Sequence, residues 1–276
     1  MDLGNEPNLW SKHQKQWHAL GPPLRPAAED LALFNREIGE WSKTNSARVC
    51  AFVLGVTPEF PSLSWPEGSS VYALDRSLSM IKTIWPSQAG HCAGAVAMDW
   101  LGVPLVDESA DIILGDGCFS LIDWPADYKR MLASLLRLLK PNGRLIMRFF
   151  LRPQISETPE KVFTDLAKGR IGNFHIFRWR LAMAMHGDNP AGIQVNDIWN
   201  LWNDSGLSAE EVALEHGWPL ESVQTIQAYD SSRQRLSFPT LNELMPVLEE
   251  NFAGIRIFFP HYELGDRCPI LSMGKD

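Results

Sequence analysis

Short apolar runs alternate with helical patterns along the middle of the chain. Continuous runs of this kind, separated by crossover segments, are typical of parallel strands that are buried on both faces. The clearest crossover helix is 126–139, where apolar residues recur every three or four positions before the breaker pair in KPNG. The pattern therefore predicts an α/β core whose strands are the runs 48–54, 70–75, 94–98, 110–116 and 143–151.

The two ends of the chain follow other patterns. Residues 1–47 hold two predicted helices, 9–20 and 29–41, separated by the breaker GPPLRP, and we expect them to form an N-terminal helical cap. From 152 to 238 the strand pattern stops and helical segments follow, with Ser208 and Glu211 spaced as a capping box, which predicts a helical insertion.

The closing segment, 239–276, completes the predicted sheet. PTLNELMPVLEENF is an amphipathic helix with Thr240 as its N-cap, and the β-runs 254–259 and 269–273 can pair antiparallel. The predicted fold is a doubly wound, seven-stranded, mostly parallel sheet with a C-terminal antiparallel hairpin, a core over 48–151 and a helical insertion before the last two strands.

Composition and charge narrow the classes of partner. Hydrophobic residues make up 45% and charged residues 21%, which is typical of a folded chain. The net charge of −8 argues against a nucleic-acid partner, because phosphate binding needs clustered Lys and Arg. No apolar run approaches the roughly 20 residues that cross a bilayer, and the four cysteines stand singly, without a zinc-site pair. We expect a cytoplasmic protein that binds a small molecule, with no membrane and no metal.

The residues that end the predicted strands are the candidates for a binding site. In doubly wound sheets the ligand lies outside the carboxyl ends of the strands, near the topological switch point. Gly55 can let a ligand approach the backbone, and Asp75 can accept hydrogen bonds from ribose hydroxyls. Asp99 beside Trp100 suits an adenine, which offers an amino donor and a flat face, and Asp116 ends the fourth strand.

Each of these residues also has an ordinary structural interpretation. A single glycine after a strand is often a turn, and Asp75 by itself can be a surface carboxylate. Asp116 lies in GDG, where an Asp is a common turn former.

In combination, three segments make the sequence resemble the class I, Rossmann-like S-adenosylmethionine-dependent methyltransferases. LDRSLSMI (74–81) is similar to the family's second-strand motif, with an acidic residue at the ribose and a Met five residues later. MDWLGVPLVDESADIILGDG (98–117) resembles its third-to-fourth strand segment, and LLRLLKPNGRLIM (135–147) its approach to the fifth strand.

This resemblance implies a function and a division of labour along the chain. The function is methyl transfer from S-adenosylmethionine to a small-molecule acceptor by direct displacement, without a metal. Residues 48–151 would be the cofactor-binding core and 152–238 the substrate-selecting region. The cofactor-binding residues would be Gly55, Asp75, Arg76, Asp99, Trp100 and Asp116.

One motif departs from the family pattern. The first-strand motif of the family has an acidic residue followed by alternating glycines, whereas the matching positions here are Ala51, Val53, Gly55 and Thr57. The departure motivates an alternative, a catalytically inactive methyltransferase-like protein that binds the cofactor or a partner in a regulatory role. A nicotinamide-dependent oxidoreductase is a weaker alternative, because LGVTPEFP lacks G-x-G-x-x-G.

The sequence does not single out a general base. His18, His175, His186, Tyr229 and His261 are candidates, although a surface or core role is the ordinary interpretation of each. Residues 172–188 combine histidines and arginines with aromatic residues, but their spacing favours an amphipathic helix with a single apolar stripe. Arg25 can meet a carboxylate of cofactor or substrate, and an exposed turn arginine is the simpler interpretation.

Overall fold

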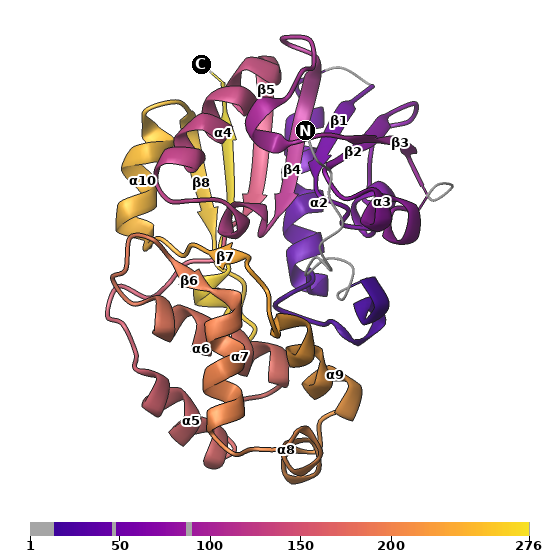
Figure 1. Cartoon of the computed structure of the whole chain (residues 1–276). Coiled ribbons are helices and arrows are strands. Elements are labelled where there is room, and N and C mark those ends of the chain that lie inside the picture. The colour runs from indigo at the N-terminus through magenta and orange to yellow at the C-terminus, as the bar shows by residue number, and fades with distance from the viewer. Residues whose placement is uncertain (1–13, 46–47, 87–89, 276) are drawn as a thin grey trace.

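A seven-stranded sheet forms the centre of the molecule (Figure 1). The computed structural model describes residues 14–45, 48–86 and 90–275. The strand order is β3-β2-β1-β4-β5-β9-β8; β1 to β5 run parallel, and β9 is antiparallel to both β5 and β8. The predicted fold class is therefore confirmed. The strands are β1 (Cys50–Leu54), β2 (Ser70–Asp75), β3 (Cys92–Ala97), β4 (Ala110–Asp116), β5 (Leu139–Arg148), β8 (Ala253–Phe258) and β9 (Ile270–Gly274).

Helices cover both faces of the sheet, because successive side chains of each strand point to opposite sides. Phe52 and Leu54 of β1 pack in one apolar cluster with α4 (Ala126–Leu138) and α10 (Leu241–Glu249). Ala51 and Val53, which alternate with them, pack with α2 (Ala28–Ser42) and α3 (Leu78–Ile84). This two-sided burial is why the strands appear in the sequence as continuous apolar runs.

Two strands differ from their predicted form. β3 lies at the edge of the sheet and is largely accessible, with Val96 39% exposed, so the expectation of burial on both faces is wrong for this strand. β5 begins at Leu139, before the breaker pair. Ala110 pairs with Leu139 whereas Ile112 pairs with Arg144, so the KPNG turn is accommodated as an irregularity in register within the strand.

The insertion lies beyond the carboxyl ends of the parallel strands and has an apolar cluster of its own (Figure 1). It also contains a two-stranded sheet, so it is not wholly helical as predicted. The capping box of Ser208 and Glu211 is present at the start of its fourth helix. Its elements are α5 (Pro159–Ala167), α6 (Phe174–His186), β6 (Ile193–Gln194), α7 (Val195–Asp204), α8 (Ala209–His216), α9 (Leu220–Gln224) and β7 (Arg235–Leu236).

Helix α6 is buried on nearly all sides, and the prediction of a single apolar stripe is wrong. Eleven of its residues are buried, including His175, Arg178 and His186 as well as the apolar ones. A helix that is apolar all round belongs in an interior. The polar residues of α6 are therefore enclosed with the core of the insertion.

The N-terminal segment packs against both the core and the insertion. Helix α2 confirms the prediction for 29–41. Of the predicted helix 9–20, residues 9–13 lie outside the described residues, and the described remainder ends in the short 3-10 helix η1 (Trp17–Ala19). Among the residues that the structure describes, no helix has both the length and the apolar character that a membrane span requires.

Candidate active site

A cavity opens at the carboxyl ends of β1, β2 and β4 and extends to the insertion. It holds about 1370 Å³ of space, part of it open to solvent. Gly55 follows β1 and Asp116 ends the adjacent β4, where the strand order reverses, so the cavity stands at the topological switch point. Three parts of the chain line the cavity. The core contributes the strand ends, and the N-terminal segment contributes Trp17, Leu20, Leu24, Arg25 and Pro26. The insertion contributes Arg178, Trp179, Val195 and Tyr229.

Gly55 has a backbone conformation that a side chain would strain. Its φ is +93°, and its N–H donates to the carbonyl of Leu74 at 2.9 Å. A Cβ atom at this position would lie 3.8 Å from the Trp100 ring and 3.9 Å from Asp75 Oδ2, which is ordinary contact distance. Glycine is therefore required for the turn, and the turn brings the backbone beside the carboxylate and the indole.

Asp75 presents one carboxylate oxygen toward the cavity. Its Oδ1 accepts a hydrogen bond from the Ser77 N–H at 2.7 Å, and no described residue donates to Oδ2. Burial raises the pKa of Asp75, opposed by that hydrogen bond and by the charge of Arg76. Arg76 is exposed at the cavity rim, and Met80, five residues after Asp75, is buried in the cavity wall.

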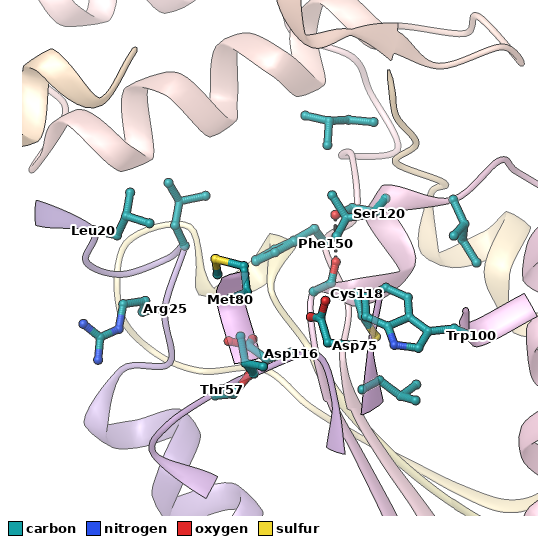
Figure 2. A pocket seen from close by; sticks show the side chains of 18 of the residues that line it. Leu20, Arg25, Thr57, Asp75, Met80, Trp100, Asp116, Cys118, Ser120 and Phe150 are labelled. Carbon is teal, nitrogen blue, oxygen red and sulfur yellow. Dashed lines mark hydrogen bonds between the residues drawn. The ribbon is translucent and has the colours of Figure 1, made fainter. Parts of the chain in front are cut away.

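Asp99 and Trp100 form the next part of the wall. The indole N–H of Trp100 donates to the Leu74 carbonyl at 2.6 Å, which fixes the ring at the mouth of the cavity. Figure 2 shows Trp100 on one side of the pocket and Leu20 and Arg25 on the other, with the carboxylates between them. Asp99 is exposed, and its Oδ1 accepts from the Leu101 N–H at 2.9 Å.

Asp116 is held in a buried ion-pair network. Its Oδ1 lies 2.5 Å from Nε of Arg148, and Nη1 of the same arginine lies 2.9 Å from Asp30 on α2. Tyr262 donates its hydroxyl to Asp30 at 3.0 Å, and Arg148 Nη2 donates to the Pro23 carbonyl at 2.8 Å. The network ties the N-terminal segment to the strand ends.

The charge of Asp116 is set by two opposing effects. Burial raises its pKa to about 6, and the Arg148 guanidinium opposes the rise. The carboxylate is therefore ionised at neutral pH, where it places a negative charge at the switch point. After it comes Gly117, whose φ is +65° and whose Cβ would overlap the Phe150 ring, so this turn also requires glycine.

All six residues expected from the sequence line this one cavity: Gly55, Asp75, Arg76, Asp99, Trp100 and Asp116. Thr57, where the family pattern has a glycine, is buried and also lines it. Arg25 is not the exposed turn residue of the simpler interpretation. It is half-buried in the cavity wall, donates from Nε to Glu59 at 3.0 Å and lies over the Trp17 ring.

The candidate bases are mostly elsewhere. His18 and His261 are surface residues next to Glu221 and Glu29, and neither lines the cavity. The ring nitrogens of His175 and His186 contact the backbone carbonyls of Ala19 and Gly187. Among the described residues no histidine lines the cavity, and Tyr229, which does, has a pKa that burial raises, unfavourable for a base at neutral pH.

Sequence reasoning missed Arg178 and Trp179 as site residues. Both are buried on α6 and line the cavity from the insertion. An available signal was the apolar character of the residues next to Arg178 in the sequence, Ile176, Phe177 and Trp179. Among the described residues no group of three or more His, Cys, Asp or Glu side chains is placed to hold a metal ion.

The chemistry of the cavity fits S-adenosylmethionine. The unpaired Oδ2 of Asp75 is an acceptor of the kind that ribose hydroxyls need, and the fixed indole of Trp100 offers a flat face for adenine. The ionised Asp116 suits an ammonium group. These groups are arranged around a glycine turn that exposes backbone.

Comparisons with known proteins agree with this geometry. Residues 54–147 match the family model described as a methyltransferase domain. A search of curated proteins found none with a significant match. Many solved structures share the fold.

Three of these structures illustrate the likeness. A putative S-adenosyl-L-methionine-dependent methyltransferase from Methanococcus maripaludis has 14% identity over 100% of this chain and 96% of its own, with a TM-score of 0.50. A protein described as a putative zinc-dependent alcohol dehydrogenase from Rhodobacter sphaeroides has 12% identity over 99% and 100%, with a TM-score of 0.55. The N-methyltransferase NodS from Bradyrhizobium japonicum, solved with S-adenosyl-L-homocysteine, has 10% identity over 96% and 98%, with a TM-score of 0.49.

At such identities a structural likeness shows the fold alone, so the alcohol dehydrogenase description carries no activity to this chain. The match over residues 54–147 adds the domain type to the fold. The strand order, the cavity at the switch point and the match over residues 54–147 together show a Rossmann-like α/β fold that contains a methyltransferase domain.

Proposed function

We propose that the chain transfers a methyl group from S-adenosylmethionine to a small-molecule acceptor held between the core and the insertion. The observation that carries this proposal is the continuity of the cavity. One wall consists of the strand ends of the matched domain, and the opposite part consists of residues of the insertion. The net charge of −8 supports a small acceptor over a nucleic acid.

The core residues are assigned to the cofactor. Asp75 would accept the ribose hydroxyls through Oδ2, and Trp100 with Asp99 would enclose the adenine. Gly55 and Asp116 would border the amino-acid end, with Gly55 exposing its backbone and Asp116 providing an anion for the ammonium group. Arg76 would close the rim beside the ribose.

The insertion and the N-terminal segment are assigned to the acceptor. Trp17, Leu20, Trp179, Val195 and Tyr229 make this part of the cavity mostly apolar. Such walls exclude water from the reacting atoms and restrict the orientation of a small molecule. Because the Cys118 thiol in the floor has a pKa raised by burial, no thiolate competes there for a methyl group.

S-adenosylmethionine, when bound, supplies an electrophilic methyl group on a sulfonium centre, and the acceptor displaces the sulfur directly. The protein's contribution is then alignment, which can lower a barrier by about 7–11 kcal/mol. No described histidine is available in the cavity as a base. We therefore propose an acceptor atom that carries its lone pair at neutral pH.

Calorimetric titration of the full chain with S-adenosylmethionine and with S-adenosylhomocysteine tests the assignment. We expect both to bind with one site per chain. If neither binds to folded protein, the proposed function is wrong.

A further inference from the structure

Arg178 is a buried arginine, and one hydrogen-bonding edge of its guanidinium has no partner among the described residues. Its side chain is fully buried on α6 and lines the cavity. Nη1 donates to the carbonyl of Thr225 at 3.1 Å and contacts its Oγ1 at 3.2 Å, and the guanidinium lies 4.7 Å from the centre of the Tyr229 ring. The other two nitrogens, Nε and Nη2, are buried and have no hydrogen-bond partner among the described residues.

No carboxylate of the described chain neutralises this charge. Burial lowers the pKa of Arg178, and the interaction with the Tyr229 phenol opposes this shift. His175, one turn earlier on the same helix, stays neutral, because burial and the charge of Arg178 lower its pKa to about 3. An unpaired buried charge is costly, and a ligand that pairs with it removes that cost.

Two other arginines near the cavity, the half-buried Arg25 and the buried Arg148, show the contrast. Arg25 is paired with Glu59, and Arg148 is shared by Asp30 and Asp116. Each of these two cations therefore has a carboxylate partner. Arg178 stands on the acceptor side, where the lining is mostly apolar.

A second donor without a partner adjoins Arg178. Trp179 also lines the cavity, and its indole Nε1 is buried with no hydrogen-bond partner among the described residues. The three nitrogens left open, two of Arg178 and one of Trp179, are all donors. A ligand that satisfies them must bring acceptor atoms into an apolar chamber.

We propose that Arg178 binds the anionic group of the methyl acceptor, and that this acceptor is a carboxylate with an apolar body. Nε and Nη2 form the side edge of the guanidinium, whose two parallel N–H bonds match the two oxygens of a carboxylate. One unpaired cation balances a monoanion and would leave a phosphate dianion partly uncompensated. That the ligand is the methyl acceptor rests on the proposed function. The preference for an anion follows from Arg178 itself.

Three variants separate binding from folding. Arg178→Met keeps an unbranched apolar stem and removes the charge, and Arg178→Lys keeps the charge but loses the paired edge. Arg170→Met is the matched control, because Arg170 precedes the same helix and its side chain is 58% exposed. Circular dichroism establishes that each variant is folded, and Arg178→Lys carries the test if Arg178→Met does not fold.

The probes are apolar carboxylates beside their neutral isosteres: octanoate, phenylacetate and cinnamate, each with its primary amide. Thermal shifts on protein saturated with S-adenosylhomocysteine select the tightest pair, and calorimetry measures both members. In the natural chain and in Arg170→Met we expect the acid to bind at least about tenfold more tightly than the amide, from two charge-assisted hydrogen bonds. In Arg178→Met the preference should fall to within about twofold, and Arg178→Lys should be intermediate.

The inference is overturned if no acid of the panel binds, if amides bind as tightly as acids, or if the position 178 variants keep the full preference. Failure of the proposed function is distinguishable. If the chain does not bind S-adenosylhomocysteine, the proposed methyl transfer is wrong. The preference of Arg178 for acids over amides is then tested separately, on protein without S-adenosylhomocysteine.

Discussion

Replacing Asp75 by Ala tests the assignment of the ribose site. Asp75 ends β2, and its Oδ2 faces the cavity without a donor from the described chain, while Oδ1 is occupied by the Ser77 N–H. The substitution removes the open acceptor. Since Asp75 contributes no packing to the apolar clusters, the fold should be retained.

The expected loss of affinity follows from the number of Asp75 carboxylate oxygens that are free to accept a hydrogen bond from the ligand. A hydrogen bond to a charged group is worth about 1.5–3 kcal/mol net, and Asp75 has one oxygen available for it. The dissociation constant of S-adenosylhomocysteine should therefore rise by about 10- to 150-fold in Asp75→Ala. Cys92→Ala is the control, because Cys92 begins β3 and does not line the cavity.

The dependence on pH provides an independent check of the same residue. Burial raises the pKa of Asp75, so the carboxyl takes up a proton at a higher pH than an exposed Asp does. Affinity for the cofactor product should fall as the pH drops through that raised pKa, because a protonated carboxyl is a weaker acceptor. Asp75→Ala should lack this dependence.

Isothermal titration calorimetry at pH 8 and at successively lower pH measures both effects. Circular dichroism confirms that each variant is folded. Equal dissociation constants for Asp75→Ala and Cys92→Ala would remove Asp75 from the ribose site, and an unchanged pH profile in Asp75→Ala would show that another group titrates.

Three further predictions concern the stability of the site. Arg148→Met leaves two buried carboxylates, Asp30 and Asp116, without their cation, so urea unfolding should show a loss of about 3–5 kcal/mol; a loss below 1 kcal/mol would contradict the network. The pKa of Asp116 is about 6 in the folded state and about 4 in the unfolded state, so between pH 4 and pH 6 the folded state binds more protons. The contribution of Asp116 to stability therefore decreases as the pH rises through this range. The difference in unfolding free energy between the natural chain and Asp116→Asn should shrink by as much as about 2 kcal/mol between pH 4 and pH 7, and a constant difference would refute the raised pKa. Gly55→Ala, at φ +93°, should destabilise by about 1–2 kcal/mol, whereas Gly39→Ala, inside α2 with open space around it, should be neutral or stabilising; equal effects in urea would exclude backbone strain at Gly55.

The ion-pair network of Arg148 also gives the N-terminal segment a structural role in the site. Arg148 at the end of β5 contacts Pro23 and Asp30, which are distant in sequence, and thereby holds the segment that supplies one wall of the cavity. Loss of this network should therefore affect ligand binding as well as stability.

The sequence by itself determined the sheet and the residues that gather at the ends of its strands. Burial on both faces is recorded along the central strands as continuous apolar runs, and parallel strands end at the same edge. Gly55, Asp75 and Asp116 could therefore be expected together from the positions at which β1, β2 and β4 end. The exposure of β3 at the edge of the sheet could not be expected from the sequence, because the order of the strands is set only when the sheet assembles.

Only the tertiary structure decided which charges are paired. Arg148 meets Asp30 across 118 residues of sequence, and no local pattern records such a contact. In the same way Arg178 resembles any helical arginine until packing encloses α6 and leaves Nε and Nη2 buried without a partner among the described residues. Periodicity reports the average polarity of a face, whereas the partner of a buried charge depends on elements that meet only when the chain is folded.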